Sequence, residues 1–192
     1  MRRVALGIIA LTMPAVLHAQ EPSPPTGAKA NPITEAFRGF GYFGNWLVAA
    51  FDSIPSDKYD FKPTPAQQSI GFIAQHLEDA NYQLCARFSG QKRPQLPGDE
   101  LPDTVRARWP KDTLVQRLRA SLMYCAAAVE HVNDANLADE TPVGPPGSGR
   151  TTTRARDLIL FLTDLADHYS QIANYMRILG LVPPSALPRS GG

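Results

Sequence analysis

The chain has 192 residues, with 19 Lys and Arg against 18 Asp and Glu, and 43% of its residues are hydrophobic. This nearly balanced charge argues against nucleic acid or an anionic membrane surface as the main partner. The length fits one domain with a sizeable hydrophobic core.

Residues 1–19 have the parts of a secretory signal peptide. Two arginines precede an apolar run over residues 4–17, and Ala19 is a small residue before a cleavage point. The run is too short to cross a bilayer comfortably. Cleavage after Ala19 removes two basic residues and no acid, which leaves 17 basic and 18 acidic residues in a mature chain of 173 (192 − 19). We therefore expect an exported protein, periplasmic or secreted, with no membrane span in the mature chain. The alternative is a buried N-terminal helix.

Residues 20–30 are rich in Pro, Gly and small residues, which predicts a disordered leader. A first helix is expected from Asn31, a good N-cap, to about Ser53, with Pro32 in its first turn. Its apolar residues recur at spacings of three and four, which predicts one core-facing stripe. The stripe consists of Ile33, Phe37, Phe40, Gly44, Leu47 and Phe51.

The second helix begins after the cap residue Ser69 and the third near a capping box at Thr113–Gln116. Between them, residues 90–110 form a long loop with four prolines. The stripe of the second helix is Ile70, Ile73, Leu77, Ala80, Leu84 and Phe88, and that of the third is Leu114, Leu118, Leu122, Cys125, Val129 and Val132. His131 falls off this stripe and is expected on the surface.

Residues 137–150 predict a flexible loop of turn formers, a lid or a linker. Residues 151–153 then cap a fourth helix over 157–179, which ends at Gly180 before Pro183. No run of residues alternates as a strand would. The sequence therefore predicts an all-α fold, a four-helix bundle over residues 31–184 with long connections, followed by a disordered tail over 185–192.

The two cysteines, Cys85 and Cys125, lie in the second and third helices. An oxidising compartment permits a disulfide between them. Two buried free thiols are equally compatible with the sequence.

A candidate metal site lies on the fourth helix. Asp164 and His168 are four residues apart, so they stack on one face of a helix and can hold one ion. A third ligand must come from elsewhere, and His76 on the second helix is the candidate. A histidine beside a core stripe is also often only a partly buried, hydrogen-bonded residue, and that alternative stays open for His76. Asp167 points away from His168 and is a poorer ligand.

Two segments together resemble the DinB/YfiT-like superfamily, namely Ser-Ile-Gly-Phe-Ile-Ala-Gln-His-Leu at 69–77 and His-Tyr-Ser-Gln-Ile-Ala-Asn-Tyr-Met-Arg-Ile-Leu-Gly-Leu-Val-Pro-Pro at 168–184. The resemblance covers roughly residues 31–184. It implies a four-helix bundle that holds a divalent metal ion, often zinc or nickel, through three histidines. His76 matches the first of these and His168 the last. Asp164 stands where the family has the second histidine.

This departure leaves two interpretations. Two imidazoles and a carboxylate suit zinc and also iron(II), with positions open for water. Alternatively, the metal site has decayed. The first interpretation predicts a metal-dependent hydrolase or transferase acting on an unknown small molecule. The second predicts a non-catalytic bundle that binds a small ligand or a structural metal, or forms a homodimer through a helix face. Whether the chain is an enzyme stays open.

The groups that could assist the site on these helices are few. Tyr82, Tyr169 and Gln171 are polar residues that could orient a ligand or the substrate. Of the carboxylates that follow His76, only Asp79 is three residues on and so shares its face, while Glu78 points elsewhere. The sequence offers no convincing general base.

Overall fold

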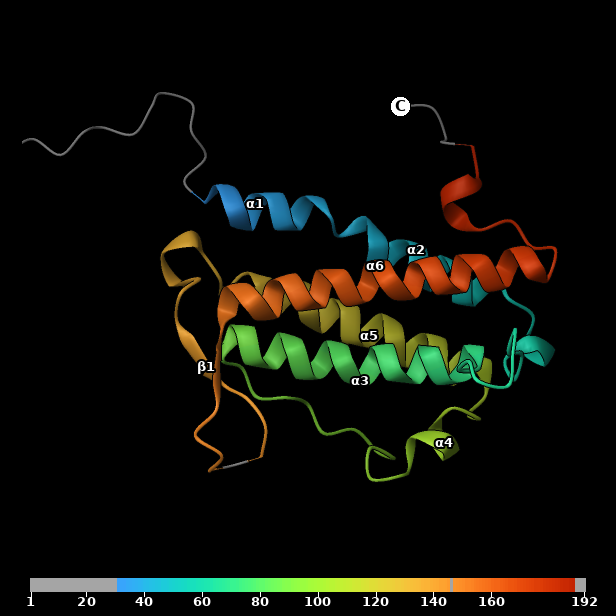
Figure 1. Ribbon diagram of the computed structural model, residues 1–192, viewed down its shortest axis with the longest axis horizontal. Coiled ribbons are helices and arrows are strands. Elements are labelled where there is room, and N and C mark those ends of the chain that lie inside the picture. The colour runs from blue at the N-terminus through green and yellow to red at the C-terminus, as the bar shows by residue number, and fades with distance from the viewer. Residues whose placement is uncertain (1–30, 146, 189–192) are drawn as a thin grey trace, which may run out of the picture.

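The computed structural model describes residues 31–145 and 147–188. The predicted signal peptide over 1–19 and the leader over 20–30 lie outside these ranges. The described chain is mostly helical, and four helices make a bundle: α2 (Tyr42–Ser53), α3 (Ile70–Ser89), α5 (Lys111–Val129) and α6 (Arg154–Ile178) (Figure 1). The predicted all-α bundle is confirmed. No helix in these ranges is long and apolar enough to span a membrane.

The helices of the bundle do not pack in sequence order. α3 packs against α5 and α6, and α2 packs against the same two helices from the opposite side. α2 and α3 are therefore diagonal to each other, and so are α5 and α6. Figure 1 shows α6 running between the α1–α2 layer and α3, with α5 behind. The long connections before α3 and α5 allow this order. As a consequence α3 and α6, the second and fourth helices of the bundle, are direct neighbours.

The first predicted helix is two helices, so the single helix from Asn31 to Ser53 is wrong. α1 (Pro32–Gly39) ends before the short turn at residues 40 and 41, and α2 follows. Gly39 at the end of α1 and Gly41 within the turn weaken a continuous helix by about 1 kcal/mol each relative to alanine. The break rotates the stripe, and Ile33 and Phe40 are 59% and 43% exposed instead of buried.

The start of α1 is capped by a residue far along the chain. The Asp134 carboxylate accepts hydrogen bonds from the backbone N–H groups of Ile33 and Thr34, both at 3.0 Å. Asp134 belongs to a one-turn helix, η2 (Asp134–Asn136). Asn31, the predicted cap, makes no side-chain hydrogen bond to α1 and instead accepts one from the backbone of Asp134 at 3.1 Å. The helix is thereby tied to the loop after α5.

The caps predicted for α3 and α6 are confirmed. The Ser69 hydroxyl accepts a hydrogen bond from the N–H of Phe72 at 3.2 Å, and the Thr153 hydroxyl accepts one from Arg156 at 3.3 Å. Gly90 ends α3 at a φ of 75°, in the left-handed region that glycine adopts without strain. α5 begins at Lys111, two residues before the expected box at Thr113, because Pro110 supplies the turn into the helix.

A short antiparallel ribbon, which the sequence did not predict, joins the loop over 137–150 to the residues just after it. β1 (Glu140–Pro142) pairs with β2 (Thr151–Thr153), and Thr141 lies opposite Thr152. Both central threonines are buried against the bundle end. The strands are too short for an alternating pattern to be visible. Their position is set instead by tertiary contact, since the Thr141 hydroxyl donates to Asp157 Oδ2 at 3.1 Å.

Three further one-turn helices complete the described chain, and they are η1 (Ser56–Lys58), α4 (Asp103–Arg106) and η3 (Pro184–Ala186). α4 lies in the long loop between α3 and α5 and packs on α3. η3 includes the first residues of the segment expected to be a disordered tail. The backbone N–H of Ser185 donates to the Tyr169 hydroxyl at 2.8 Å, which joins this segment to α6.

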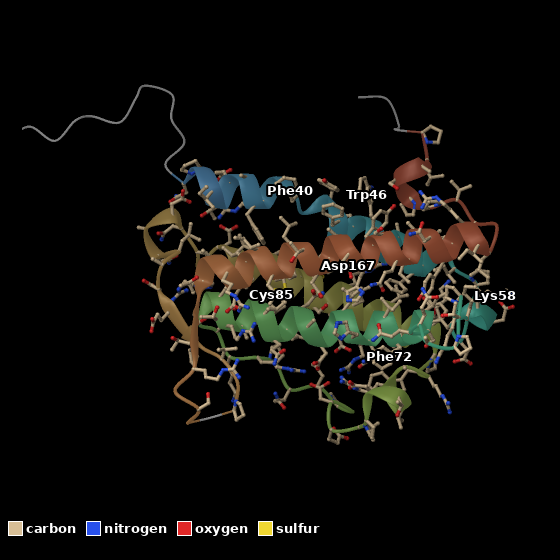
Figure 2. The ribbon with its side chains drawn as sticks, in the orientation of Figure 1. Phe40, Trp46, Lys58, Phe72, Cys85 and Asp167 are labelled. Carbon is tan, nitrogen blue, oxygen red and sulfur yellow. A yellow bond between two sulfur atoms is a disulfide. The ribbon has the colours of Figure 1, made fainter. Side chains whose placement is uncertain are left out.

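Cys85 and Cys125 form a disulfide that joins α3 to α5 across 40 residues of chain. This decides the question that the sequence left open. Both residues are almost wholly buried in the core, and the label in Figure 2 places Cys85 within the bundle. The bond fixes α3 against α5 while α6 packs on the other side of α3.

Candidate metal centre

The candidate centre lies between α3 and α6, near the middle of both helices. His76 is half-buried on α3, and its ring lies parallel to that of Phe72, with 6.5 Å between the ring centroids and 11° between the planes. Phe72 is one helical turn before His76, so the same face presents both rings. This packing limits the directions in which the imidazole can turn.

α6 brings Asp164 and His168 to the same place. Their i,i+4 spacing puts His168 Nε2 3.5 Å from Asp164 Oδ1, and the side chains are 9% and 22% exposed. The rings of His76 and His168 meet edge to face with 5.0 Å between their centroids. The tertiary structure thus brings together all three residues that the sequence analysis put forward.

The donor atoms of the three residues fit one metal ion. One ligand atom from each of His76, Asp164 and His168 can be chosen so that all lie within 4.8 Å of one another. Bonds of ~2.1 Å to a tetrahedral ion require separations of about 3.4 Å, so small side-chain rotations close the set. In the described part of the chain, Asp164 Oδ2 is buried and has no hydrogen-bond partner. A buried carboxylate oxygen of this kind is expected to have a partner, and a cation would serve.

Burial acts to lower the pKa of His168, but the hydrogen bond and the negative charge of Asp164 outweigh it. Gln171 and Asp167 add smaller effects in the same direction, so the pKa of His168 lies above the usual value for imidazole. The carboxylate therefore attracts a positive charge to this position. A proton and a metal ion compete for the same nitrogen.

A second set of contacts lies behind His168. Gln171 Oε1 is 3.4 Å from His168 Nδ1, and Gln171 Nε2 donates to Asp167 Oδ2 at 2.9 Å. Asp167 is exposed and is not one of the converging ligands, in agreement with its predicted orientation. Its label in Figure 2 lies on the α6 side of the boundary with α3.

The other residues considered as helpers lie away from the centre or are engaged elsewhere. Tyr169 accepts a hydrogen bond from Ser185, and its ring packs near Trp46 with 5.1 Å between centroids. Tyr82 packs against Tyr124. None of these contacts of the two tyrosines involves a donor atom of His76, Asp164 or His168. Of the three polar groups that the sequence suggested, only Gln171 contacts a candidate ligand.

The carboxylates that follow His76 are paired with arginines. Asp79 Oδ1 is 2.6 Å from Arg93 and 3.6 Å from the buried Arg106. Glu78 is buried and pairs with Arg117 at 2.7 Å. An acid held in such ion pairs is poorly placed to take a proton from a substrate. The sequence could not show this, because the arginines come from the 90–110 loop and α5.

Comparisons with known proteins agree with this architecture. A model of the DinB superfamily matches residues 45–172, a range that includes all three candidate ligands. A search of curated proteins gave no match.

Two solved structures have a similar fold. A DinB-like protein from Bacillus cereus ATCC 10987 superposes with a TM-score of 0.60 at 17% identity, covering 78% of this chain and 95% of that one. A conserved protein from Enterococcus faecalis gives 0.57 at 16% identity, covering 77% and 96%. At these identities the likeness shows the fold alone. The family match covers well over half of the chain, and the chain belongs to the DinB superfamily.

Proposed function

We propose that this protein binds one divalent metal ion between α3 and α6 through His76, Asp164 and His168. The observation that carries the proposal is the convergence of three donor atoms from two helices, with a buried carboxylate oxygen of Asp164 left without a partner. Zinc or nickel is the preferred ion, and iron(II) also accepts two imidazoles and a carboxylate.

The three-residue set favours a reactive ion over a purely structural one. Structural zinc sites are closed by four protein ligands, whereas catalytic sites keep one position for water or substrate. A metal ion in such a site lowers the pKa of a coordinated water molecule and polarises a carbonyl or phosphoryl group. His76, Asp164 and His168 would hold the ion, and the negative charge of Asp164 would partly compensate the charge of the ion. We infer a hydrolase or transferase that acts on a small molecule.

A second candidate function is a non-catalytic bundle that binds a metal or a small ligand. The observation that favours it is the pairing of Asp79 and Glu78 with arginines, which leaves no free general base following His76. Self-association through a helix face belongs to this candidate, and the mass of the purified protein in solution tests it.

Export is part of the proposal. The buried disulfide between α3 and α5 supports it, because such bonds persist in oxidising compartments outside the cytoplasm. Fractionation of cells, with the mass of the mature N-terminus, tests this point. A full-length chain recovered from the cytoplasm would contradict it.

Metal analysis by mass spectrometry tests the central claim. The mature protein, purified after supply of excess zinc or nickel at neutral pH, is expected to carry about one ion per chain. His168→Ala should lose it, because only two donor atoms remain. His131→Ala is the matched control, since His131 is an exposed histidine in the turn after α5. No stoichiometric ion in the wild type, or an equal content in His168→Ala, would refute the site.

A further inference from the structure

The structure contains a chain of contacts that ends on one candidate ligand. Gln171 lies four residues after Asp167 and three residues after His168 on α6, so its side chain is next to both on the helix surface. The Gln171 side chain bridges the other two, at 2.9 Å to Asp167 and 3.4 Å to His168 Nδ1. Among the described residues, no hydrogen bond of this kind holds the ring of His76.

The direction of the Gln171 amide follows from the chemistry of Asp167. An ionised carboxylate only accepts hydrogen bonds, so the NH₂ group of Gln171 must face it. The carbonyl oxygen of the amide then faces His168 Nδ1, and this oxygen can only accept. A proton on Nδ1 therefore has a partner, whereas a lone pair on Nδ1 would face a carbonyl lone pair. At the other nitrogen, Nε2 faces the Asp164 carboxylate, which is also an acceptor, so a metal ion on Nε2 removes the competition and leaves the proton to Gln171.

We propose that Gln171, oriented by Asp167, is a positioning residue that accepts the Nδ1 proton of neutral His168 and so favours, against the competing acceptor Asp164, the tautomer that leaves Nε2 free for the metal ion. Nε2 is the nitrogen that faces Asp164, at 3.5 Å. The opposite tautomer would put the proton of Nε2 into the space between the three ligands. Metal-binding histidines commonly donate their second ring N–H to such a partner, which fixes the ring and raises its basicity. The inference rests on the proposed metal site.

Two measurements test it, and the first needs no metal. Long-range ¹H–¹⁵N spectra of the metal-free protein, above the pKa of His168, distinguish the two tautomers of each histidine. In the metal-free protein Gln171 at Nδ1 and Asp164 at Nε2 compete for the one proton of the neutral ring. We therefore expect the share of His168 rings with the proton on Nδ1 to be larger in the wild type than in Gln171→Ala, which leaves Asp164 without this competitor. An equal share in the two proteins, or a larger share in Gln171→Ala, overturns the inference.

The second measurement is zinc affinity by calorimetry. Gln171→Ala should weaken binding about 10- to 100-fold, the range seen when such outer partners are removed. Asn174→Ala is the matched control, an exposed amide residue one turn further along α6, and it should bind as the wild type does. Wild-type affinity in Gln171→Ala overturns the inference.

A double-mutant cycle separates the orientation of Gln171 from the plain charge of Asp167. Asp167→Ala should weaken zinc binding in the wild type but have little further effect in Gln171→Ala, because its role passes through the amide. An equal loss in both backgrounds overturns the role given to Asp167. If wild-type protein binds no metal, the proposed function fails, and the spectra of the metal-free protein still decide the tautomer by themselves.

Discussion

Removal of the Cys85–Cys125 disulfide is expected to lower the free energy of unfolding substantially. The bond closes a loop with a sequence separation of 40 residues. The loop-closure relation gives about 13 cal/mol/K for a loop of this length, which is about 4 kcal/mol at 25 °C. Replacement of both cysteines by alanine also removes two buried sulfur atoms from the core, at about 1 kcal/mol each by comparison with a methylene group.

The assay is urea unfolding followed by circular dichroism. The Cys85→Ala/Cys125→Ala variant should unfold with a free energy about 3–5 kcal/mol below that of the wild type, since engineered and natural cross-links often give less than the full entropy. With a slope of about 2 kcal/mol per molar urea for a domain of this size, the midpoint falls by about 2 M.

Fully reduced and refolded wild-type protein isolates the cross-link itself, because it keeps both sulfur atoms. It should also unfold earlier than the oxidised protein. A difference below about 1 kcal/mol between the oxidised and reduced forms would show that helix packing alone holds α3 against α5, and the reasoning from loop closure would be wrong.

Three other changes have defined outcomes. Asp157→Ala leaves the Arg87 guanidinium without the carboxylate that it contacts at 2.9 Å, and a loss of about 3–5 kcal/mol is expected in the same unfolding assay; a loss under 1 kcal/mol contradicts it. Gly71→Ala places a methyl group 2.2 Å from the backbone oxygen of Ala107, which should cost about 1–3 kcal/mol and lower the melting temperature. An unchanged melting temperature would show that the backbone at Ala107 moves away at little cost. In metal-free protein, the raised pKa of His168 contributes stability that is fully present below about pH 6.5 and is lost as the pH rises through the folded-state pKa. The amount by which the melting temperature of the wild type exceeds that of His168→Gln should therefore shrink with rising pH. A difference that stays constant contradicts this.

Much of the bundle was predictable because local patterns and tertiary packing agree there. Ser69 caps α3, Gly90 ends it, and the apolar residues between them face the core as their spacing indicates. The first helix was not predictable as two pieces. Its stripe remains regular through Phe40, and the break depends on weak glycine positions and on the cap that Asp134 supplies from the loop after α5.

The candidate metal centre was also predictable only in part. The i,i+4 spacing of Asp164 and His168 determines their common face as soon as α6 is helical. The approach of His76 depends on the neighbouring position of α3 and α6, which the order of helices in the bundle decides. The spacing of Gln171 from His168 was visible, but its contact with Asp167 required the side-chain conformations.

Periodicity along one segment is enough to place the long helices α3, α5 and α6, the faces that they bury and the residues that could bind a metal ion. The other features depend on how separate segments pack against one another. That packing paired the cysteines, placed the threonine ribbon on the bundle end, tied Asp79 and Glu78 to arginines from other segments, and put His76 beside His168. Each of these is a contact between residues far apart in the chain, and its energy depends on packing that no local pattern contains.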